Sequence, residues 1–352
     1  MPALTEEILR NEMPEVERAV RFGYARKYPL SALAREAGKP DNSHFYWNAY
    51  YLPDTPVEGV VDGTRTSADT SEQTLQVVGY TQEIRQDWAV SRRTKAVKSH
   101  DAHNTSAWQM KRALEKLYRK KEIAIGSRQD LQEQVKATNT PQLLRGLLNI
   151  LLPKNVAGQS LHPVPDEARL RNGAYYGGAL ASLTADAFRA MLKEAAMYFG
   201  GEVELTGFCG PDLKAQMASW VYRDATSSGT KAYRTVVGDA DMKLNLDVDV
   251  FKFGEGVVTT VLDFWLACDV ATGARTALSA QAGVFIEPRE LFTHTLQGLS
   301  HTSIDDEGQG DGGFYAVDFG LGYGMPSKAL LVLPGVAATQ NQAGGSGTGT
   351  GG

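Results

Sequence analysis

The sequence predicts an α+β fold, and three patterns along the chain carry that prediction. The segment Ser106–Ile125 has the apolar periodicity of one long amphipathic helix. Ahead of it, residues 42–97 have the composition of extended chain on both sides of a polar loop. Behind it, from about residue 180, helix-like and strand-like segments alternate. A chain of 352 residues, 42% of them hydrophobic, is long enough for two or three packed domains.

The part of the chain before the long helix is predicted to be an arm followed by a two-stranded excursion. Residues 1–40 are polar and helix-prone but lack sustained periodicity, as in an arm that lies outside the core. Residues 42–56 are rich in aromatic side chains, and residues 57–71 are dense in Gly, Asp, Thr and Ser, which is typical of an exposed loop. Residues 74–97 then alternate apolar and polar side chains with some breaks. The two extended pieces therefore predict a hairpin with a polar tip.

The helix at Ser106–Ile125 is the clearest element in the sequence. Its apolar side chains recur with a 3-1-3-1 spacing between Met110 and Ile125, so they share one stripe of the helix. Charged residues fill the positions between them. Twenty residues at a rise of ~1.5 Å per residue make a rod about 30 Å long. Gly126 is the predicted stop, because glycine adopts a positive φ at low cost.

Helices and strands are both predicted after the long helix. Residues 141–152 are predicted to form a shorter helix, and residues 155–178 a Gly- and Pro-rich connection. Thr184 is the predicted N-cap of a helix that ends at Gly200. A strand is predicted at residues 203–209, and the proline that follows it is predicted to open another helix.

The last part of the chain is predicted to consist of strands and a tail. Residues 244–253 and 257–268 are predicted as two strands around a Gly-Glu-Gly turn, and residues 282–286 and 329–333 as two more. Residues 337–352 contain mostly Gly, Thr, Ser, Gln and Asn, with no core-forming content. We expect this last segment to be a disordered tail.

The overall composition excludes several classes of protein. The chain has 36 Lys and Arg against 41 Asp and Glu, a net charge of −5, whereas dedicated nucleic-acid binders are usually more basic. The first ten residues carry acidic side chains and no apolar core, unlike a signal peptide. The longest apolar stretch, residues 143–152, is far short of the roughly 20 residues that span a bilayer. No membrane contact is expected.

Neither cysteine is predicted to be reactive. Cys209 and Cys268 are too far apart for a zinc or redox motif, so we expect a reducing compartment and no disulfide framework. Cys209 falls at the end of a predicted strand and Cys268 within an apolar one. Both are predicted to be inert core thiols.

Two groups of side chains are candidates for chemistry, and a plain structural explanation fits each better. His100, Asp101 and His103 precede the long helix, but a metal site needs further converging ligands, and a polar helix entry explains these residues. Asp247 and Asp249 share one face of a predicted strand. Paired catalytic carboxylates need a cleft and a raised pKa, whereas a solvated strand face needs neither. No catalytic residue, metal site or cofactor is therefore predicted.

A glycine run and an acidic segment occur near the end of the chain. Gly320, Gly322 and Gly324 form a G-x-G-x-G run, but a dinucleotide fingerprint requires a helix after it, and here Pro326 and a predicted strand follow. The acidic residues among the neighbouring glycines are predicted to form a solvated loop with weak cation binding at most; they are Asp305, Asp306, Glu307 and Asp311.

Charge is distributed unevenly along the chain. Residues 85–128 contain 12 basic and 4 acidic residues, a local net charge of +8 that leaves −13 for the remainder. A charged helix face is ordinarily solvated, but such a face also suits phosphate groups or an acidic neighbouring subunit. The basic residues of the long helix that form this candidate surface are Lys111, Arg112, Lys116, Arg119 and Lys120.

Short strings and the order of the elements resemble the major capsid proteins of a subgroup of tailed phages. The strings are residues 80–85 (YTQEIR), 90–91 and 95–97 before the Lys/Glu-rich helix, with residues 42–47 (NSHFYW) at the start of the predicted hairpin. Downstream, Leu183 and Thr184 with their helix, the two glycines that end it, and the strand–helix pair after it are similar as well. The resemblance spans roughly residues 42–333.

The resemblance implies a Hong Kong 97-type capsid fold in five parts. Residues 1–46 would be an N-terminal arm, and residues 47–97 an extended loop that reaches over the next subunit. Residues 98–179 would form a peripheral domain with the spine helix Ser106–Ile125. Residues 180–336 would supply an axial domain and returning peripheral strands, and residues 337–352 the Gly-rich tail.

The function implied is that of a structural protein without enzymatic activity. Such a chain self-assembles into hexamers and pentamers of an icosahedral virion shell that encloses double-stranded DNA. Its partners would be other copies of itself, the packaged DNA through non-specific contacts, and scaffolding, portal and decoration proteins. In that setting we expect the five basic residues to face the lumen or a seam between subunits.

Two alternative functions stay open on the sequence alone. The same fold could build a prokaryotic nanocompartment, an encapsulin-like shell, and the cargo would discriminate: nucleic acid for a virus, a folded enzyme for a compartment. The other alternative is a cytoplasmic hydrolase or transferase that uses Asp247 and Asp249. Replacing both by Asn would then abolish a measurable turnover.

Overall fold

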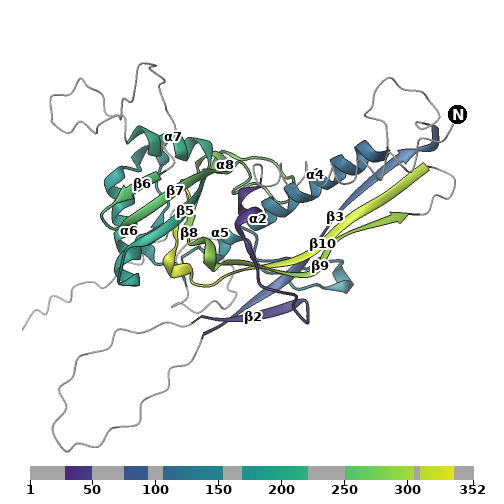
Figure 1. Ribbon diagram of the computed structural model, residues 1–352, viewed down its shortest axis with the longest axis horizontal. Coiled ribbons are helices and arrows are strands. Elements are labelled where there is room, and N and C mark those ends of the chain that lie inside the picture. Colours follow the sequence, from purple (N-terminus) through teal and green to yellow (C-terminus); the bar gives the residue numbers. More distant parts are fainter. Residues whose placement is uncertain are drawn as a thin grey trace, which may run out of the picture.

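The computed structural model describes residues 28–49, 75–93, 106–153, 169–220, 250–304 and 310–336. They form an elongated molecule with a long β-sheet beside the helix α4 (Ser106–Ile125) and a compact second sheet with shorter helices at the other end (Figure 1). The helix α4 has the bounds that its periodicity predicts. Within the described ranges, no helix combines the length and the apolar character that crossing a membrane requires.

The long sheet has five strands in the order β1-β9-β10-β3-β2. Strands β9 and β10 form an antiparallel hairpin, and β10 pairs antiparallel with β3 from Gly310–Ser91 to Gly320–Thr81. At the far end of β3, residues 75–80 pair with β2, so the predicted two-stranded excursion is confirmed for the described residues. The strand bounds are β1 Arg35–Glu36, β2 His44–Ala49, β3 Leu75–Ser91, β9 Leu291–Ile304 and β10 Gly310–Tyr323.

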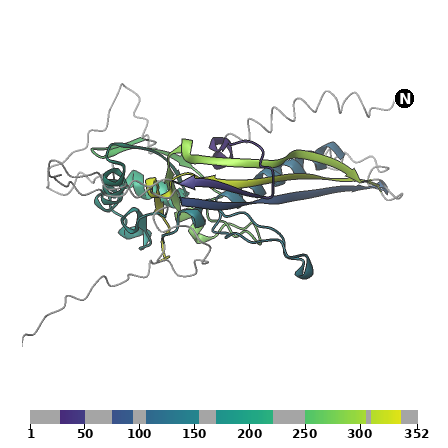
Figure 2. The ribbon, with the colours of Figure 1, turned by 90° about the horizontal axis from the view of Figure 1, so that it is seen from below.

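The helix α4 runs along β3 and β10, as both views show (Figures 1 and 2). Leu117 and Ile125 on its apolar stripe are buried, and they join Ile84 of β3 and Phe319 of β10 in the core. Burying such a side chain stabilises the fold by roughly 1.5–3 kcal/mol. The stripe therefore fixes the helix along the length of the sheet.

The compact sheet has six strands in the order β4-β11-β8-β5-β7-β6. Strands β5 and β7 are parallel, and the chain between them includes helix α7 (Pro211–Ser219). Helix α6 (Ala185–Phe199) packs on β5 and β11, where Phe188 meets Phe285 edge to face with ring centroids 4.9 Å apart. The strand bounds are β4 Tyr175–Tyr176, β5 Val203–Cys209, β6 Val250–Phe253, β7 Gly256–Leu262, β8 Gly283–Ile286 and β11 Leu330–Val332.

The remaining elements of the described residues are short. The remaining α-helices are α2 (Pro29–Leu33), α5 (Leu147–Ile150) and α8 (Ala277–Gln281). The 3-10 turns are η2 (Lys136–Thr138), η4 (Asn172–Ala174), η5 (Leu180–Ser182), η6 (Pro288–Glu290) and η7 (Pro326–Lys328).

The predicted ends of α6 and the start of α7 are confirmed. The Thr184 hydroxyl accepts a hydrogen bond from the Ala187 amide, 3.2 Å away, as an N-cap does. Gly200 ends the helix with φ +72°, a conformation that favours glycine. Pro211 occupies the first turn of α7, where its missing N–H costs nothing.

Two predicted elements differ from the structure, and two strands were not predicted. Residues 141–146 are not helical, because the amides of Leu143 and Gly146 bond to the carbonyls of Gln132 and Gln129. Strand β7 ends at Leu262, so Cys268 lies in the following turn and not in a strand. The strands β9 and β10 were not predicted.

Several expectations lie outside the described residues. They concern the loop at residues 57–71, most of the connection at residues 155–178, the strand at residues 244–249 and the tail at residues 337–352.

Candidate assembly surfaces

The five predicted basic residues all lie on the exposed side of α4. Lys111, Arg112, Lys116, Arg119 and Lys120 are exposed, opposite the stripe that packs on the sheet. The helical geometry spreads them over about half of the circumference, since successive residues are rotated by roughly 100°. They therefore form a broad basic face, and what this face contacts stays a prediction.

Two of the five are bound to other elements of the chain, and Arg112 lies over the ring of Trp108 in α4 itself, 5.3 Å from the ring centre. The Arg119 guanidinium lies 4.1 Å from the centre of the Trp265 ring and donates to the Gly273 carbonyl at 3.2 Å. The Lys120 ammonium donates to the Arg85 carbonyl at 2.8 Å, and burial lowers its pKa. These two fasten α4 to its neighbours, which leaves the face beside Lys111, Arg112 and Lys116 as the part available to a partner.

An arginine that sequence reasoning missed extends this surface. The Arg275 guanidinium lies 4.4 Å from the Trp265 ring centre, so that Trp265 contacts both Arg275 and Arg119. Arg275 also lies 5.2 Å from the ring centre of Phe264, which is 42% exposed. Cation–π contacts of this kind orient the guanidinium groups. Phe264, Trp265 and Arg275 lie in the turns after β7, where the sequence has no periodicity that would indicate this contact.

The outer edge of β9 is a second candidate surface. Only Phe292 and Thr293 pair with β1, and beyond them this edge has no backbone partner among the described residues. The fourteen residues of β9 include no Lys, Arg, Asp, Glu or Pro, the residues that usually protect an edge strand. Leu299 and Ile304 beside it are 47% and 52% exposed. An edge of this kind is suited to pairing with another chain.

A projecting finger at residues 131–143 is a third candidate surface (Figure 2). Its two sides are joined by bridges from Gln132 to Leu143 and from Val135 to Thr140, with η2 at the tip. Val135 is 45% exposed on it. Such a projection presents side chains well away from the body of the subunit.

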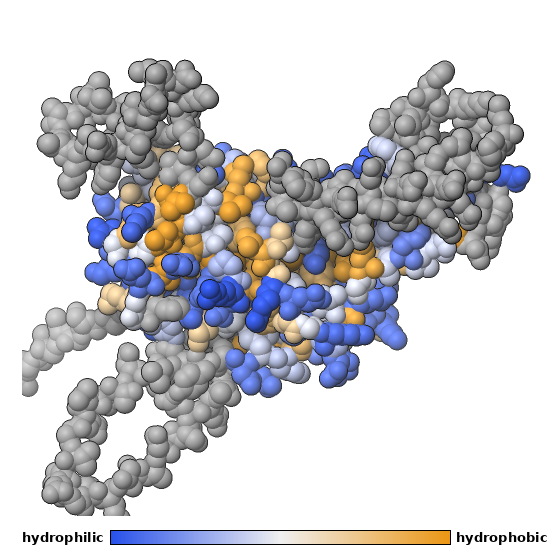
Figure 3. Space-filling view, in the orientation of Figure 1, coloured by the Kyte–Doolittle hydropathy of each residue, from blue (hydrophilic) through white to orange (hydrophobic). Residues whose placement is uncertain are grey.

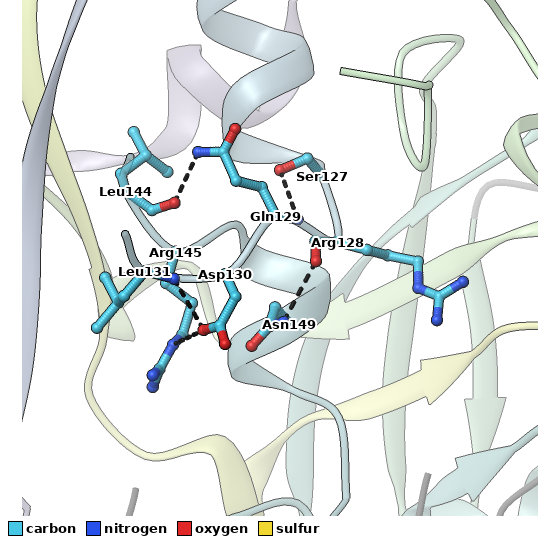
Figure 4. Close-up of polar contacts among 8 residues, drawn as sticks. All are labelled: Ser127, Arg128, Gln129, Asp130, Leu131, Leu144, Arg145 and Asn149. Atoms are coloured by element: carbon cyan, nitrogen blue, oxygen red, sulfur yellow. Dashed lines mark hydrogen bonds and ion pairs between the residues drawn. The ribbon is translucent and has the colours of Figure 1, made fainter. Parts of the chain in front are cut away.

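The root of the finger is fastened by a polar network at the end of α4 (Figure 4). Arg145 and Asp130 form an ion pair with Nε and Oδ1 3.1 Å apart, and the Arg145 side chain is only 6% exposed. The side-chain amide of Gln129 donates to the Leu144 carbonyl at 2.7 Å. The side-chain amide of Asn149 donates to the Arg128 carbonyl at 3.2 Å. The finger therefore leaves the body at a fixed point.

The candidate metal-binding and catalytic residues of the sequence lie outside the part of the chain that the structure describes. No group of three or more His, Cys, Asp or Glu side chains there is placed to hold a metal ion. The residues 100–103, 247–249 and 305–307 lie outside the described ranges. Asp311 lies in β10 and not in a loop, and it accepts a hydrogen bond from the Ser106 hydroxyl at 3.2 Å. Cys209 and Cys268 are free and buried, and burial raises the pKa of both thiols, as expected for inert core cysteines.

The glycine run has a packing explanation. Gly320 and Gly322 lie within β10, where a Cβ would clash with the rings of Phe45 and Phe292 respectively. Glycine therefore lets two aromatic rings lie directly on the strand. The run has no connection with a dinucleotide.

Comparison with known proteins gives one family. The family model of the SU10 major capsid protein matches residues 25–337. A direct search of the curated proteins gives no match.

Several of the solved structures with similar folds carry the names of phages. The structure titled Mycobacterium phage Ogopogo has a TM-score of 0.51 at 13% identity, covering 87% of this chain and 91% of that one. Gordonia phage Cozz gives 0.50 at 13% identity, covering 88% and 86%. The mature capsid of bacteriophage PhiM1 gives 0.50 at 11% identity, covering 87% and 86%. At these identities the likeness shows the Hong Kong 97-like fold alone, and the family match carries the function. The chain belongs to the SU10 major capsid protein family, and it is a structural, non-enzymatic subunit of the icosahedral shell of a phage virion.

Proposed function

We propose that the chain assembles into hexamers and pentamers that close around double-stranded DNA. In this proposal residues 1–46 form an arm, residues 47–97 an extended loop over the neighbour, and residues 98–179 a peripheral domain with α4 as its spine. Residues 180–336 supply the axial domain and the returning strands β9 and β10. The pairing of β3 with β10, which joins segments far apart in sequence beside α4, supports this division.

The open, uncharged edge of β9 carries the proposal that copies of the chain join by strand pairing. An edge of about ten residues without charge or proline is an aggregation hazard unless a partner covers it. In a protein that builds a closed shell, that partner is another copy. Head-to-tail contacts of this kind close into rings, as hexamers and pentamers require.

The edge is tested by placing charge on it. Leu299→Lys combined with Ile304→Lys changes only side chains that are about half exposed. We expect the purified double variant to keep the unfolding midpoint of the wild-type subunit but to form few shells in electron micrographs, because lysines on an edge oppose pairing. Normal shell yield would contradict the proposed role of β9.

The basic face of α4 is proposed to lie against packaged DNA or an acidic surface of a neighbouring subunit. The exposed positions of Lys111, Arg112 and Lys116 support this, together with the local net charge of +8. Phosphate contacts of this kind are sequence-independent and weaken with salt. If the basic face lies in the lumen, removing its charge should reduce the DNA content of the shells. If it lies at a seam between subunits, removing its charge should reduce assembly.

The charged face is tested by reversing two of its residues. With Lys111→Glu and Lys116→Glu together, we expect either fewer shells or shells with less DNA, measured by micrographs and by the nucleic-acid content of purified particles. Lys252→Glu, on the exposed strand β6, is the matched control. An unchanged yield of filled particles would exclude both the lumen and the seam as the location of the basic face. Scaffolding, portal and decoration proteins are proposed as further partners in the infected cell.

A further inference from the structure

A fully buried glutamate of α4 binds the short helix α2. The Glu122 side chain is 0% exposed and accepts hydrogen bonds from the backbone amides of Leu30 and Ser31, each at 2.8 Å, and from the Ser31 hydroxyl. Both amides lie in the first turn of α2, where backbone N–H groups have no acceptor within the helix. The carboxylate therefore pairs donors that would otherwise be left unsatisfied inside the protein.

Apolar packing holds α2 at the same end of α4. The Leu30 side chain is 0% exposed and belongs to the main core. It lies against Gly126, where an added Cβ would be 3.3 Å from the Leu30 Cδ1 atom. The Gly126 amide donates to the Glu122 carbonyl at 2.9 Å, so these two residues are one helical turn apart on the same side of α4. One surface of α4 thus receives both the amides and the buried side chain of α2.

The segment that follows α2 covers the beginning of the β9 edge. Only Ala34 separates α2 from β1, and β1 pairs in parallel with the start of β9. The Ala37 amide donates to the Thr293 carbonyl at 2.9 Å, and the His294 Nδ1 atom lies 3.1 Å from the Gly38 carbonyl oxygen. With a single residue between them, α2 and β1 have little freedom to move independently.

We propose that residues 28–38 form one strap that covers the start of the β9 edge, and that Glu122 is the positioning residue that holds this strap. The two residues of β1 pair too briefly to stay in place alone, since even an isolated two-stranded hairpin is at best marginally stable in water. Docking of α2 on α4 therefore keeps β1 against β9. Release of the strap would leave more of the β9 edge open to pairing with other chains.

Hydrogen exchange of the full chain at fixed pH, followed by mass spectrometry with fragmentation, tests the strap. Glu122→Gln places an NH₂ group against N–H donors, so the amides of residues 30–37 are expected to exchange at least about tenfold faster. The Ala37 amide is expected to exchange faster together with those of Leu30 and Ser31, although it bonds to β9 and not to Glu122. The amides that pair β3 with β10 are expected to keep their wild-type exchange. The strap lies within one chain, so this result does not depend on the assembly contacts proposed above.

A milder variant and a matched control accompany this change. Ser31→Ala removes only the hydroxyl donor and leaves the carboxylate paired with both amides, so we expect exchange in residues 30–37 to be roughly three- to tenfold faster. Glu115→Gln is the control, because this exposed residue of α4 contacts the strap through its backbone carbonyl, which accepts a hydrogen bond from the Tyr28 hydroxyl at 3.2 Å. Wild-type exchange is expected in the control.

Three results would overturn the proposal. The first is wild-type exchange of the strap in Glu122→Gln, or in Ser31→Ala where Glu122→Gln does not fold. The second is faster exchange of the α2 amides while the Ala37 amide keeps its wild-type rate, because the strap would then not move as one unit. The third is an equal rise in exchange in β3 and β10 of Ser31→Ala, because Glu122 would then stabilise the whole subunit and not the strap.

Discussion

Single residues fix where the segments of this subunit meet. Gly320 and Gly322 make room for the rings of Phe45 and Phe292 on β10, and the buried pair of Asp130 and Arg145 holds the root of the finger. The glycine contacts join residues far apart in sequence, and the pair of Asp130 and Arg145 joins the two ends of the finger. Each joins elements that a shell subunit must hold in register.

Replacing Gly320 by alanine is expected to destabilise the subunit. A Cβ there would clash with the Phe45 ring and lie 3.1 Å from the Tyr80 carbonyl oxygen, so strand and ring must shift. We expect a loss of about 1–3 kcal/mol in the free energy of unfolding, measured by denaturant titration. Gly298→Ala in β9 is the control, since a Cβ there meets no atom within 4 Å. Equal effects at both positions would contradict the packing explanation.

Replacing Asp130 by asparagine is expected to cost more than the same change at the surface. Arg145 is largely buried and would lose its ion-pair partner, for a loss of roughly 2–4 kcal/mol. Asp87→Asn removes a pair whose side chains are 48% and 68% exposed, and we expect less than about 1 kcal/mol. Denaturant titration of both variants measures the difference, and a difference near zero would show that the network in Figure 4 does not stabilise the finger.

At the scale of elements, local signals were predictable and non-local ones were not. The bounds of α4 follow from its apolar stripe, and α6 from its Thr184 cap and Gly200 stop, because these depend on residues close in sequence. Strand β9 consists largely of Gly, Ser, Thr and His, and five of the fourteen residues of β10 are Gly, so neither strand has a strong local signal in the sequence. Gly126 was expected to end α4 with a positive φ, but its φ is not positive; it lets Leu30 and Leu266 approach closely.

The candidate surface was only partly predictable for the same reason. Periodicity places all five basic residues on the outer side of α4, and that is where they lie. It could not indicate that Arg119 and Lys120 bond to the chain itself, or that Arg275 joins the surface, because those contacts come from a distant turn and from β3. The open edge of β9 was not foreseen because the strand itself was not.

At the scale of the whole molecule, uneven charge and open edges suit a subunit that completes itself in an assembly. The exposed side of α4, the edge of β9 and the projecting finger lie on different parts of an elongated body (Figures 1 and 2). In the space-filling view, apolar side chains also reach the surface over the compact sheet (Figure 3). Extensive surfaces of this kind are typical of obligate assemblies, which bury thousands of Å².

Electron microscopy of the expressed chain, alone and with its viral assembly partners, shows whether this subunit builds a closed shell. We expect closed icosahedral shells built from rings of five and six subunits. A chain that remains monomeric under both conditions, in micrographs and in light scattering, would contradict the proposed role as a shell subunit.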